Sequence, residues 1–304
     1  MEYAYGIDLG GTNMRVAVVS SEGLLLGSRQ RKTPVKEGPE ATAVSLSQMI
    51  CELAAEHPVS IRGIGIGSPG PLSRSEKRIF HTPNLPGFDG FPLGHRMQSL
   101  TSLPVFLDND AKCATFGEAL YGAARGARHV IMLTFGTGVG GGVIADGHMI
   151  YGKGDNAGEI GHLTLYPNGQ ACNCGNRGCL EQYLSARAIG RRATERAGRA
   201  VGVIELMDAH ARDKKWATDL LREIATDLAI AVASLVNIFE PEVIVLGGGV
   251  FSSGGGPLCP WVAEEIRERC FASSQLDLRI VASTLGGDAG VLGAASLVHR
   301  SQSI

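Results

Sequence analysis

The 304-residue sequence lacks the features of several large protein classes. It contains no run of about eighteen apolar residues, so we expect no membrane-spanning segment. No positively charged segment followed by an apolar run precedes Asp8, which argues against a signal peptide. With 28 basic and 30 acidic side chains, the chain has no excess of positive charge to indicate nucleic-acid binding. We therefore expect a cytoplasmic protein with no nucleic-acid partner and no membrane partner.

Long runs of one charge and low-complexity segments are also missing, so no disordered tail is predicted. Glycine, in contrast, is abundant, at 42 residues. The glycines gather in separate loops, which indicates turns and places where the backbone approaches a ligand. In the cytoplasm the seven cysteines are not expected to form structural disulfides. Four of them are scattered along the chain and are expected to be small buried side chains: Cys51, Cys113, Cys259 and Cys270.

The order of the predicted elements indicates an α/β protein. In the first part of the chain we predict strands at 4–8, 14–20, 24–31, 61–67 and 105–107, with helices at 39–56 and 111–121. The strand at 105–107 runs into three polar residues, Asp108, Asn109 and Asp110, before the helix begins. A strand, a polar end and then a helix is typical of doubly wound sheets, in which ligands bind at the carboxyl ends of the strands.

From about Arg128 the layout repeats. Here we predict a strand at 130–135, a glycine turn at 136–142, strands at 143–145, 242–246 and 278–281, and helices at 186–199, 203–212, 216–239 and 288–300. The repetition predicts an internally duplicated α/β fold of two lobes with a cleft between them. We expect a small N-terminal lobe of residues 1–111 plus about 288–304, and a large C-terminal lobe of residues 112–287.

Three glycine turns follow predicted strands. They are Gly10-Gly11-Thr12 after Asp8, Gly136-Thr137-Gly138, and Gly247-Gly248-Gly249. The N–H groups of such turns can bind phosphate oxygens, and a carboxylate such as that of Asp8 can hold Mg²⁺. One turn alone is more often an ordinary hairpin, but three together favour a nucleotide site. They match neither the Walker pattern nor the Rossmann glycine pattern.

Asp110 has two interpretations. Its carboxylate, at a strand end, can accept the proton of a substrate hydroxyl that attacks phosphorus, with Asn109 orienting that hydroxyl. Equally, Asp or Asn at this place can be the N-cap of the adjoining helix. Two loops that contain proline, Ser68–Pro71 and Thr82–Pro86, suit a ligand rich in hydroxyl groups, or they are ordinary surface turns.

The strongest local feature is a loop with one imidazole and three thiols: His162, Cys172, Cys174 and Cys179. One nitrogen and three sulfurs make a closed, four-coordinate zinc set. A redox pair is less favoured because the third thiol and the imidazole complete that set, and an iron–sulfur cluster usually takes four cysteines. Glu159 and Glu181 flank the loop, so we expect a structural metal that holds polar groups in place. His148 and Asp155 are expected at the surface.

Taken in order, these motifs resemble the ROK family of sugar kinases and repressors, which has the actin-like ATPase (ribonuclease H-like) fold. The resemblance covers nearly the whole chain through Asp8-Leu-Gly-Gly-Thr12, Gly67-Ser-Pro-Gly70, Thr82-Pro-Asn84-Leu85, Asn109-Asp110-Ala111, Gly136-Thr-Gly138, Gly158-Glu-Ile-Gly-His162, Cys172-Asn-Cys-Gly-Asn-Arg-Gly-Cys-Leu-Glu181 and Leu246-Gly-Gly-Gly249. Within the family the chain is most similar to the bacterial members that phosphorylate glucose with ATP. The resemblance therefore implies a hexose kinase, acting first on D-glucose at its 6-hydroxyl.

The resemblance also implies a role for each matching residue. Asp110 would be the catalytic base. Hydroxyl groups of the sugar would bind to Ser68, Asn84, Asn109, Asp110, Glu159, His162 and Glu181. ATP and Mg²⁺ would contact Asp8, Gly10, Gly11, Thr12, Gly136, Thr137, Gly138, Gly247 and Gly248. His162 would bind the structural Zn²⁺ as well. Lys112 departs from the family, which often has Asn there, and a homodimer is expected.

Several alternatives stay open. Kinases for N-acetylmannosamine, allose, mannose and fructose share most of these motifs, and polyphosphate is an alternative phosphoryl donor. A sugar-responsive repressor of the same family would carry a helix-turn-helix ahead of the Asp8 motif, where this sequence has seven residues. An actin-like or chaperone-type ATPase that acts on a protein would have no use for the zinc set or for Asn109 and Asp110.

Overall fold

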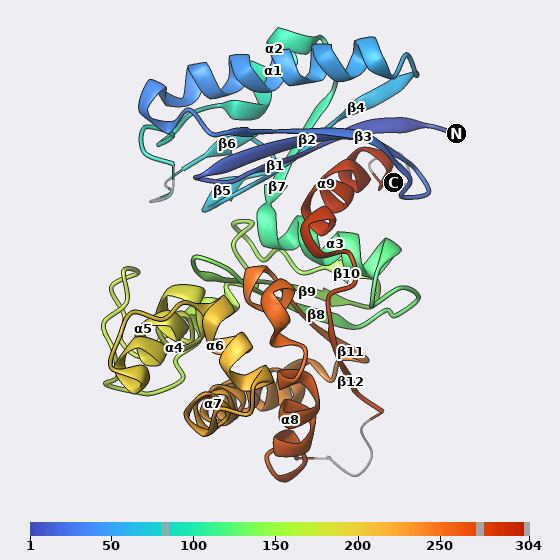
Figure 1. Cartoon of the computed structure of the whole chain (residues 1–304). Helices are drawn as coiled ribbons and strands as arrows, with labels where there is room; N and C mark the ends of the chain where they lie inside the picture. The colour runs from blue at the N-terminus through green and yellow to red at the C-terminus, as the bar shows by residue number, and fades with distance from the viewer. Residues whose placement is uncertain (81, 83–84, 272–276, 301–304) are drawn as a thin grey trace. The chain divides into compact units, whose positions relative to one another are not determined.

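Two five-stranded sheets, one in each of two units, organise the chain (Figure 1). The computed structural model describes residues 1–80, 82, 85–271 and 277–300. The first unit comprises Met1–Arg125, Tyr151–Ala157 and the chain from Gly287 onward, and the second comprises Gly126–Ile150 and Gly158–Gly286. The expected boundary after residue 111 differs from this division, which keeps the helix beginning there in the first unit. The sequence pattern did not predict that residues 151–157 go with the first unit.

The sheet of the first unit has the order β3-β2-β1-β4-β7. Its strands are β1 (Tyr3–Leu9), β2 (Asn13–Ser20), β3 (Leu25–Lys32), β4 (Ile61–Ser68) and β7 (Val105–Asn109). The first three are antiparallel neighbours, whereas β4 and β7 run parallel to β1. The other elements of this unit are η1 (Val35–Glu37), α1 (Gly38–Glu56), the hairpin β5 (Leu72–Ser73) and β6 (Arg78–Ile79), α2 (Leu93–Thr101), α3 (Asp110–Tyr121), η6 (Gly286–Asp288) and α9 (Ala289–Arg300).

The two faces of this sheet differ in side-chain size, because successive residues of a strand point to opposite faces. Large apolar residues of β1, such as Ile7 and Leu9, pack in a core with Leu46 of α1 and Met97 of α2. The opposite face carries small residues and is covered by α9 and α3 (Figure 1). The alternation of Ile and Gly along β4 therefore assigns one face to the core and the other to α9.

Glycines let α9 approach this face at backbone distance. A Cβ atom added to Gly6 of β1 would lie 2.0 Å from the carbonyl oxygen of Val291, and one added to Gly65 of β4 would lie 1.7 Å from that of Ala294. A Cβ added to Gly293 of α9 would lie 1.6 Å from the carbonyl oxygen of Cys113 in α3. Any side chain at these three positions would push α9 away from the sheet or from α3.

The sheet of the second unit has the matching order β10-β9-β8-β11-β12. Its strands are β8 (Val130–Phe135), β9 (Val139–Ala145), β10 (His148–Met149), β11 (Val243–Gly247) and β12 (Arg279–Ala282). Again three antiparallel neighbours are extended by two parallel strands. The other elements are η2 (Ile160–His162), α4 (Glu181–Leu184), α5 (Ala186–Ala197), α6 (Val203–Ala211), α7 (Lys215–Phe239), η3 (Phe251–Gly255), α8 (Leu258–Glu265) and η4 (Ile266–Glu268). The repeated order confirms the predicted duplication.

One prediction in this unit was wrong. The glycine turn expected at 136–142 ends at Gly138, because β9 already begins at Val139 and pairs with β8 from Val139 to Ile144. A Cβ atom added to Gly141 would come within 2.7 Å of the side chain of Ile160. That strand glycine therefore makes room for η2 instead of forming a turn.

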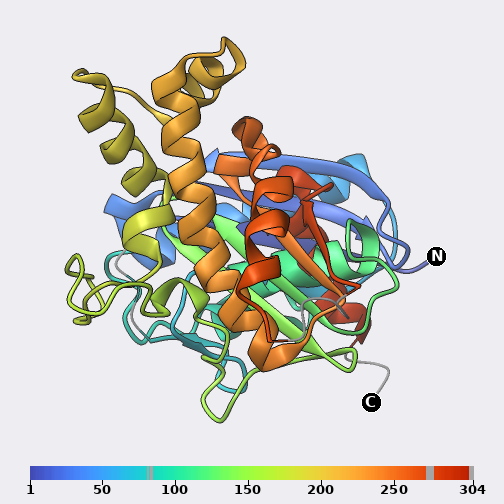
Figure 2. The same ribbon diagram turned by 90° about the horizontal axis from the view of Figure 1, so that it is seen from below.

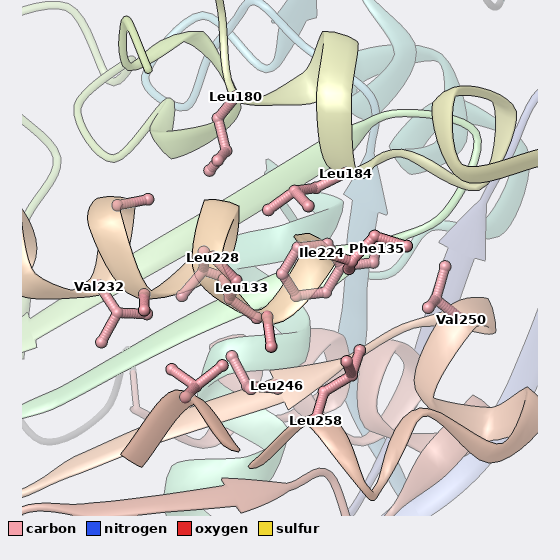
Figure 3. Close-up of a cluster of buried hydrophobic side chains, with 14 of the residues drawn as sticks. Leu133, Phe135, Leu180, Leu184, Ile224, Leu228, Val232, Leu246, Val250 and Leu258 are labelled. Carbon is pink, nitrogen blue, oxygen red and sulfur yellow. The ribbon is translucent and has the colours of Figure 1, made fainter. Parts of the chain in front are cut away.

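The long helix α7 packs against α5, α6 and α8 (Figure 2). Its apolar side chains, among them Ile224 and Leu228, meet Leu133 of β8 and Leu246 of β11 in a buried cluster (Figure 3). Leu180 and Leu184, on the C-terminal side of the Cys172–Cys179 loop, belong to the same cluster. Each fully buried side chain of this size contributes roughly 1.5–3 kcal/mol to folding, so the loop is anchored to the core at its C-terminal end.

Within the described ranges, no helix is both long and apolar enough to span a bilayer. All seven cysteines are free thiols. Cys113, Cys259 and Cys270 are buried as predicted, whereas Cys51 is exposed.

The close contact between α9 and α3 predicts a strong effect of Gly293→Ala. The added methyl group would overlap the backbone of Cys113, so we expect a loss of about 3 kcal/mol in the free energy of unfolding. Gly287→Ala is the matched control, because an added Cβ there meets no described atom within 4 Å. Urea titration should show little change for the control, and an unchanged midpoint for Gly293→Ala would contradict the packing described above.

Candidate functional site

The carboxyl ends of three parallel strands bring several predicted site residues of the first unit together. Asp8 of β1 is in register with Gly67 of β4, which is in register with Asp108 of β7. Residues in register on parallel strands point to the same face of a sheet. Asp8 and Asp108 therefore lie on the α9 face, on either side of a glycine. Asn109 ends β7, and Asp110 opens α3 directly after it.

The N-cap of α3 is Asn109. Its Oδ1 accepts hydrogen bonds from the N–H groups of Ala111 at 3.0 Å and Lys112 at 3.2 Å. Asp110 is the first residue of the helix, and its Oδ1 accepts a hydrogen bond from the N–H of Ala111 at 2.8 Å. The capping role that the sequence left open between the two residues thus belongs to Asn109. The carboxylate of Asp110 lies at a helix N-terminus, where negative charge is stabilised.

Three carboxylates converge on the buried thiol of Cys113. Burial raises the pKa of this thiol well above its ordinary value, and the negative charges of Asp108, Asp110 and Asp8 raise it further. Gly67 lies between Asp8 and Asp108 in the sheet, and a Cβ atom added to it would lie 3.1 Å from Sγ of Cys113 and 3.4 Å from the Cα of Asp110. The candidate base and the candidate Mg²⁺ ligand, far apart in the sequence, are therefore neighbours in the first unit.

Asp8 lies beside the first glycine turn. Burial raises the pKa of its carboxyl group, and the positive charge of Arg15 opposes that rise. A Cβ atom added to Gly290 would lie 2.9 Å from Oδ2 of Asp8, so the backbone of α9 passes directly by the carboxylate. The turn is closed by a 2.9 Å hydrogen bond from the N–H of Gly10 to the carbonyl of Asn13. A carboxylate beside such a turn suits a Mg²⁺–phosphate group, and this role stays a prediction.

The second glycine turn is connected to Glu181. The N–H of Val139 donates a 3.0 Å hydrogen bond to Oε2 of Glu181. A Cβ atom added to Gly138 would lie 2.3 Å from the same oxygen, so this position has to be glycine while Glu181 keeps its place. Thr137 at the tip of the turn is exposed. A residue predicted to bind sugar is thus hydrogen-bonded to the residue that directly follows a turn predicted to bind phosphate.

The third glycine turn, after β11, has a backbone that only glycine adopts easily. Gly248 has a φ angle of +83°, and a Cβ atom added to it would lie 2.6 Å from backbone atoms of Phe135. Both conditions exclude a side chain at this position. The bare backbone is what close contact with a nucleoside requires, and the predicted contact with adenosine stays a prediction.

The four predicted zinc ligands lie together. One ligand atom from each of His162, Cys172, Cys174 and Cys179 lies within 4.8 Å of all the others. Cys172 Sγ is 3.7 Å from Nδ1 of His162, and Cys174 Sγ is 3.6 Å from Cys179 Sγ. A tetrahedral zinc with Zn–S bonds of about 2.3 Å keeps its sulfur ligands about 3.8 Å apart. The donor set and its spacing therefore fit a zinc ion with four protein ligands.

The Cys172–Cys179 loop is held in place from outside the ligand set. A Cβ atom added to Gly178 would lie 1.8 Å from the carbonyl oxygen of Tyr166, so the loop passes close to that residue. The hydroxyl of Tyr166 donates a 2.5 Å hydrogen bond to Asp227 of α7, and Arg192 of α5 pairs with the same carboxylate at 2.6 Å. Burial and this hydrogen bond raise the pKa of Tyr166 to about 12, so it stays a donor at neutral pH.

The remaining predicted sugar ligands lie in different surroundings. Glu159 and His162 are exposed in the second unit. Ser68 is fully buried, and its hydroxyl donates a 3.2 Å hydrogen bond to the carbonyl of Pro69. Asn84 lies outside the described residues. The contacts of these four residues with a sugar stay predictions.

Two residues of interest were missed by sequence reasoning, Asp108 and Tyr151. Asp108 is 1% exposed, and its Oδ2 accepts a 2.6 Å hydrogen bond from the hydroxyl of Tyr151. Only the strand-end position of Asp108 marked it in the sequence, and nothing marked Tyr151. His148 is exposed as expected, but the same expectation for Asp155 was wrong. Asp155 is half-buried and accepts a 3.0 Å hydrogen bond from the N–H of Arg74.

Known proteins resemble this chain over nearly its whole length. A family model described as "ROK family" matches residues 4–301. The glucokinase of Thermotoga maritima is 36% identical over 312 residues, which cover 97% of this chain and 96% of that protein. The solved ROK hexokinase from Thermus thermophilus has a TM-score of 0.88 at 36% identity, covering 99% of both chains. A ROK family glucokinase from Streptomyces griseus, solved with glucose and AMPPNP, has a TM-score of 0.86 at 29% identity, covering 98% of this chain and 99% of that one.

The zinc set predicts about one zinc ion per chain in the purified protein. Cys172→Ala removes one ligand, so we expect loss of the metal and a fall of about 5–10 °C in the thermal midpoint, because metal binding is coupled to folding. Cys51→Ala is the control, since it removes an exposed thiol of the first unit. Metal analysis and thermal unfolding check both variants, and a wild-type protein purified without zinc would contradict the assignment.

Proposed function

Because the chain belongs to the ROK family, we propose that it is a glucokinase, which transfers the terminal phosphoryl group of ATP to the 6-hydroxyl of D-glucose. One observation carries this proposal: Asp8 is in register with Gly67 of β4, and a Cβ atom added to Gly67 would lie 3.4 Å from the Cα of Asp110, so the two acidic residues flank one position. Phosphoryl transfer needs a proton acceptor for the attacking hydroxyl and a place for the cation that accompanies the phosphates. These two carboxylates would supply both.

Asp110 is the proposed base. It would accept the proton of the 6-hydroxyl as that oxygen attacks the γ-phosphorus of ATP. Its carboxylate lies in the first turn of α3, where the helix N-terminus attracts negative charge. Asn109 caps this turn with its amide oxygen, which fixes the turn while the amide group orients the sugar.

The glycine turns would hold ATP. Mg²⁺, bound together with ATP, neutralises phosphate charge, and Asp8 would hold it directly or through water. The turns Gly10–Thr12 and Gly136–Gly138 offer backbone N–H groups and hydroxyls to the phosphates. Gly247 and Gly248 would face the adenosine. The exposed hydroxyls of Thr12 and Thr137 support this arrangement.

Carboxylate and amide side chains would recognise the sugar through hydrogen bonds to its hydroxyl groups. The proposed partners of its hydroxyl groups are Ser68, Asn84, Asn109, Asp110, Glu159, His162 and Glu181. A site built from hydrogen bonds rejects the wrong epimer strongly, because wrong stereochemistry leaves buried polar groups unpaired. Zn²⁺ held by His162, Cys172, Cys174 and Cys179 would have no open position, so it would supply rigidity to this wall and not reactivity.

Other members of the family define the alternatives. A kinase for N-acetylmannosamine, allose, mannose or fructose would use the same base and the same phosphate turns, and so would an enzyme that takes polyphosphate as donor. A repressor that binds sugar without phosphorylating it would have no need of Asp110. The expected homodimer and the cytoplasmic location stay predictions.

Asp110→Asn tests the base. The variant keeps the shape of the side chain but cannot accept the proton, so we expect kcat to fall by about 10³-fold. Glucose affinity, measured by calorimetry, should stay within about 3-fold. Asp213→Asn is the control, because Asp213 is exposed and its positive φ angle is one that Asn tolerates. Turnover of Asp110→Asn near the wild-type rate would remove Asp110 from the mechanism.

A panel of substrates tests the reaction. Release of ADP should be measured with glucose, mannose, fructose, allose and their 2-acetamido forms, and a parallel series should replace ATP by polyphosphate. We expect the highest kcat/KM with glucose and ATP. A preference for a 2-acetamido sugar would replace glucose as the substrate, and absence of turnover with every sugar would favour the repressor.

A further inference from the structure

Five residues of the first unit form what we call the Asp108 cluster: Arg74, Asp108, Lys112, Tyr151 and Asp155. We propose that this cluster positions Asp110 for proton transfer and couples it to the segment Tyr151–Ala157. Asp108, near the end of β7, is the positioning residue, and the hydroxyl of Tyr151 is hydrogen-bonded to its carboxylate. The inference rests on the proposed role of Asp110 as the base.

Both oxygens of Asp108 are engaged. Oδ1 accepts a 2.8 Å hydrogen bond from the N–H of Asn109, and Oδ2 accepts the 2.6 Å bond from the hydroxyl of Tyr151. Nε of Arg74 lies 3.6 Å from the same Oδ2. The side chain of Asp108 is 1% exposed, so water does not compete for these contacts. The carboxylate therefore has one fixed orientation.

This orientation reaches Asp110 through two short steps. The hydrogen bond from the N–H of Asn109 to Oδ1 of Asp108 fixes the orientation of the peptide group that joins Asp108 to Asn109. Asn109 in turn caps α3 through the N–H groups of Ala111 and Lys112, and Asp110 lies inside that capped turn. A rotation of Asp108 would turn the peptide and redirect the carboxylate of Asp110. Misplacement of a reacting group by about 1 Å can cost about 10²-fold in rate.

The other members of the cluster hold Tyr151 and its segment. The guanidinium of Arg74 lies over the ring of Tyr151, 3.5 Å from its centre, which is cation–π geometry. The N–H of Arg74 donates to Oδ2 of Asp155 at 3.0 Å, and Nζ of Lys112 donates to the carbonyl oxygen of Asp155 at 3.0 Å. The segment is thus bound to α3 as well as to β7.

Burial of Lys112 in the first turn of α3 lowers the stability of the fold unless its charge is compensated. Lys112 is 1% exposed, and a positive charge in the first turn of a helix opposes the helix dipole. The cluster balances this charge, because two cations, Lys112 and Arg74, face two anions, Asp108 and Asp155. The carbonyl oxygen of Asp155 gives the buried ammonium group of Lys112 a hydrogen-bond partner.

The segment Tyr151–Ala157 leads directly to a proposed sugar ligand. The chain leaves the second unit at Tyr151, joins the first, and returns to the second at Gly158, immediately before Glu159. Glu159 is one of the residues proposed to bind the sugar. The cluster therefore connects, within the first unit, the base and the segment that leads to a residue for substrate binding.

Tyr151→Phe tests the coupling. It removes the hydroxyl that holds Asp108 and keeps the ring under Arg74. We expect kcat to fall about 10-fold while KM for glucose and for ATP stays within about 3-fold. Hydrogen exchange should become faster at residues 109–113 and at 151–157 together. The matched control is Tyr121→Phe, which removes a hydroxyl that donates to the carbonyl of Ser21 from the far end of the same helix and should change neither readout.

A role in folding alone gives a different result. A variant with a lower thermal midpoint but wild-type kcat, measured well below that midpoint, would overturn the proposal, as would faster exchange at 151–157 without any change at 109–113. If Tyr151→Phe does not fold, Arg74→Gln is the second variant, because the Arg74 side chain is 39% exposed and its replacement leaves no cavity in the core. We expect Arg74→Gln to lower kcat about 3-fold with little change in KM. Hydrogen exchange needs no turnover, so a wild-type protein inactive on glucose would overturn the proposed function and leave the coupling to be decided by exchange.

Discussion

The contact of α9 with the sheet and with α3 at backbone distance is the constraint on which the first unit depends. Glycines on β1, β4 and α9 permit it, and no other residue would fit at Gly6, Gly65 or Gly293. This contact places Gly290 against Asp8 and brings α3 over the strand ends, with Cys113 against Gly67, the glycine between Asp8 and Asp108. The small side chains are thus the reason why acidic groups from distant segments share one buried neighbourhood.

Burial of these carboxylates has an electrostatic cost, and the surroundings offset it in different ways. Burial raises the pKa of Asp108, whereas the hydrogen bond from Tyr151 and the charges of Arg74 and Lys112 lower it. Asp8 has Arg15 as its neighbouring cation, and Arg15 is itself paired with Asp288, the last residue of η6 before α9. The negative charge of Asp110 lies at the N-terminus of α3, where the helix dipole stabilises it. Each carboxylate therefore has its own set of stabilising partners.

Much of the fold could be predicted from local patterns, and the exceptions have physical reasons. All strands of the first sheet, β8, β11, β12 and the end of β9, and the helices α1, α3, α5, α6, α7 and α9 were predicted because their apolar residues repeat at the spacing of a strand or a helix. The two-residue strand β10 and the four-residue helix α4 were not predicted, because they are too short to show such a repeat. α2 and α8 were missed because Gly94 lies inside the first, and Pro257 and Pro260 stand at the beginning of the second. Proline is tolerated in the first turn of a helix, but it hides that helix in the sequence.

The functional residues also differ in how far the sequence could predict them. The zinc set was predictable because all four ligands lie in one short loop. The Asp108 cluster was not, because its members come from three segments that only the folded chain brings together, and because a buried Lys112 or Tyr151 has no signature of its own. Asp110 was found only as one of two equal interpretations; the structure assigns the cap to Asn109, and the role of Asp110 as the base stays a prediction.

The most direct test of the proposed mechanism is a crystal structure of the protein with glucose and a non-hydrolysable ATP analogue. We predict that a carboxylate oxygen of Asp110 lies about 2.6–3.2 Å from the 6-hydroxyl oxygen of glucose. A 6-hydroxyl that contacts another carboxylate, or that lies more than about 4 Å from Asp110 in the closed complex, would contradict the assignment of Asp110 as the base.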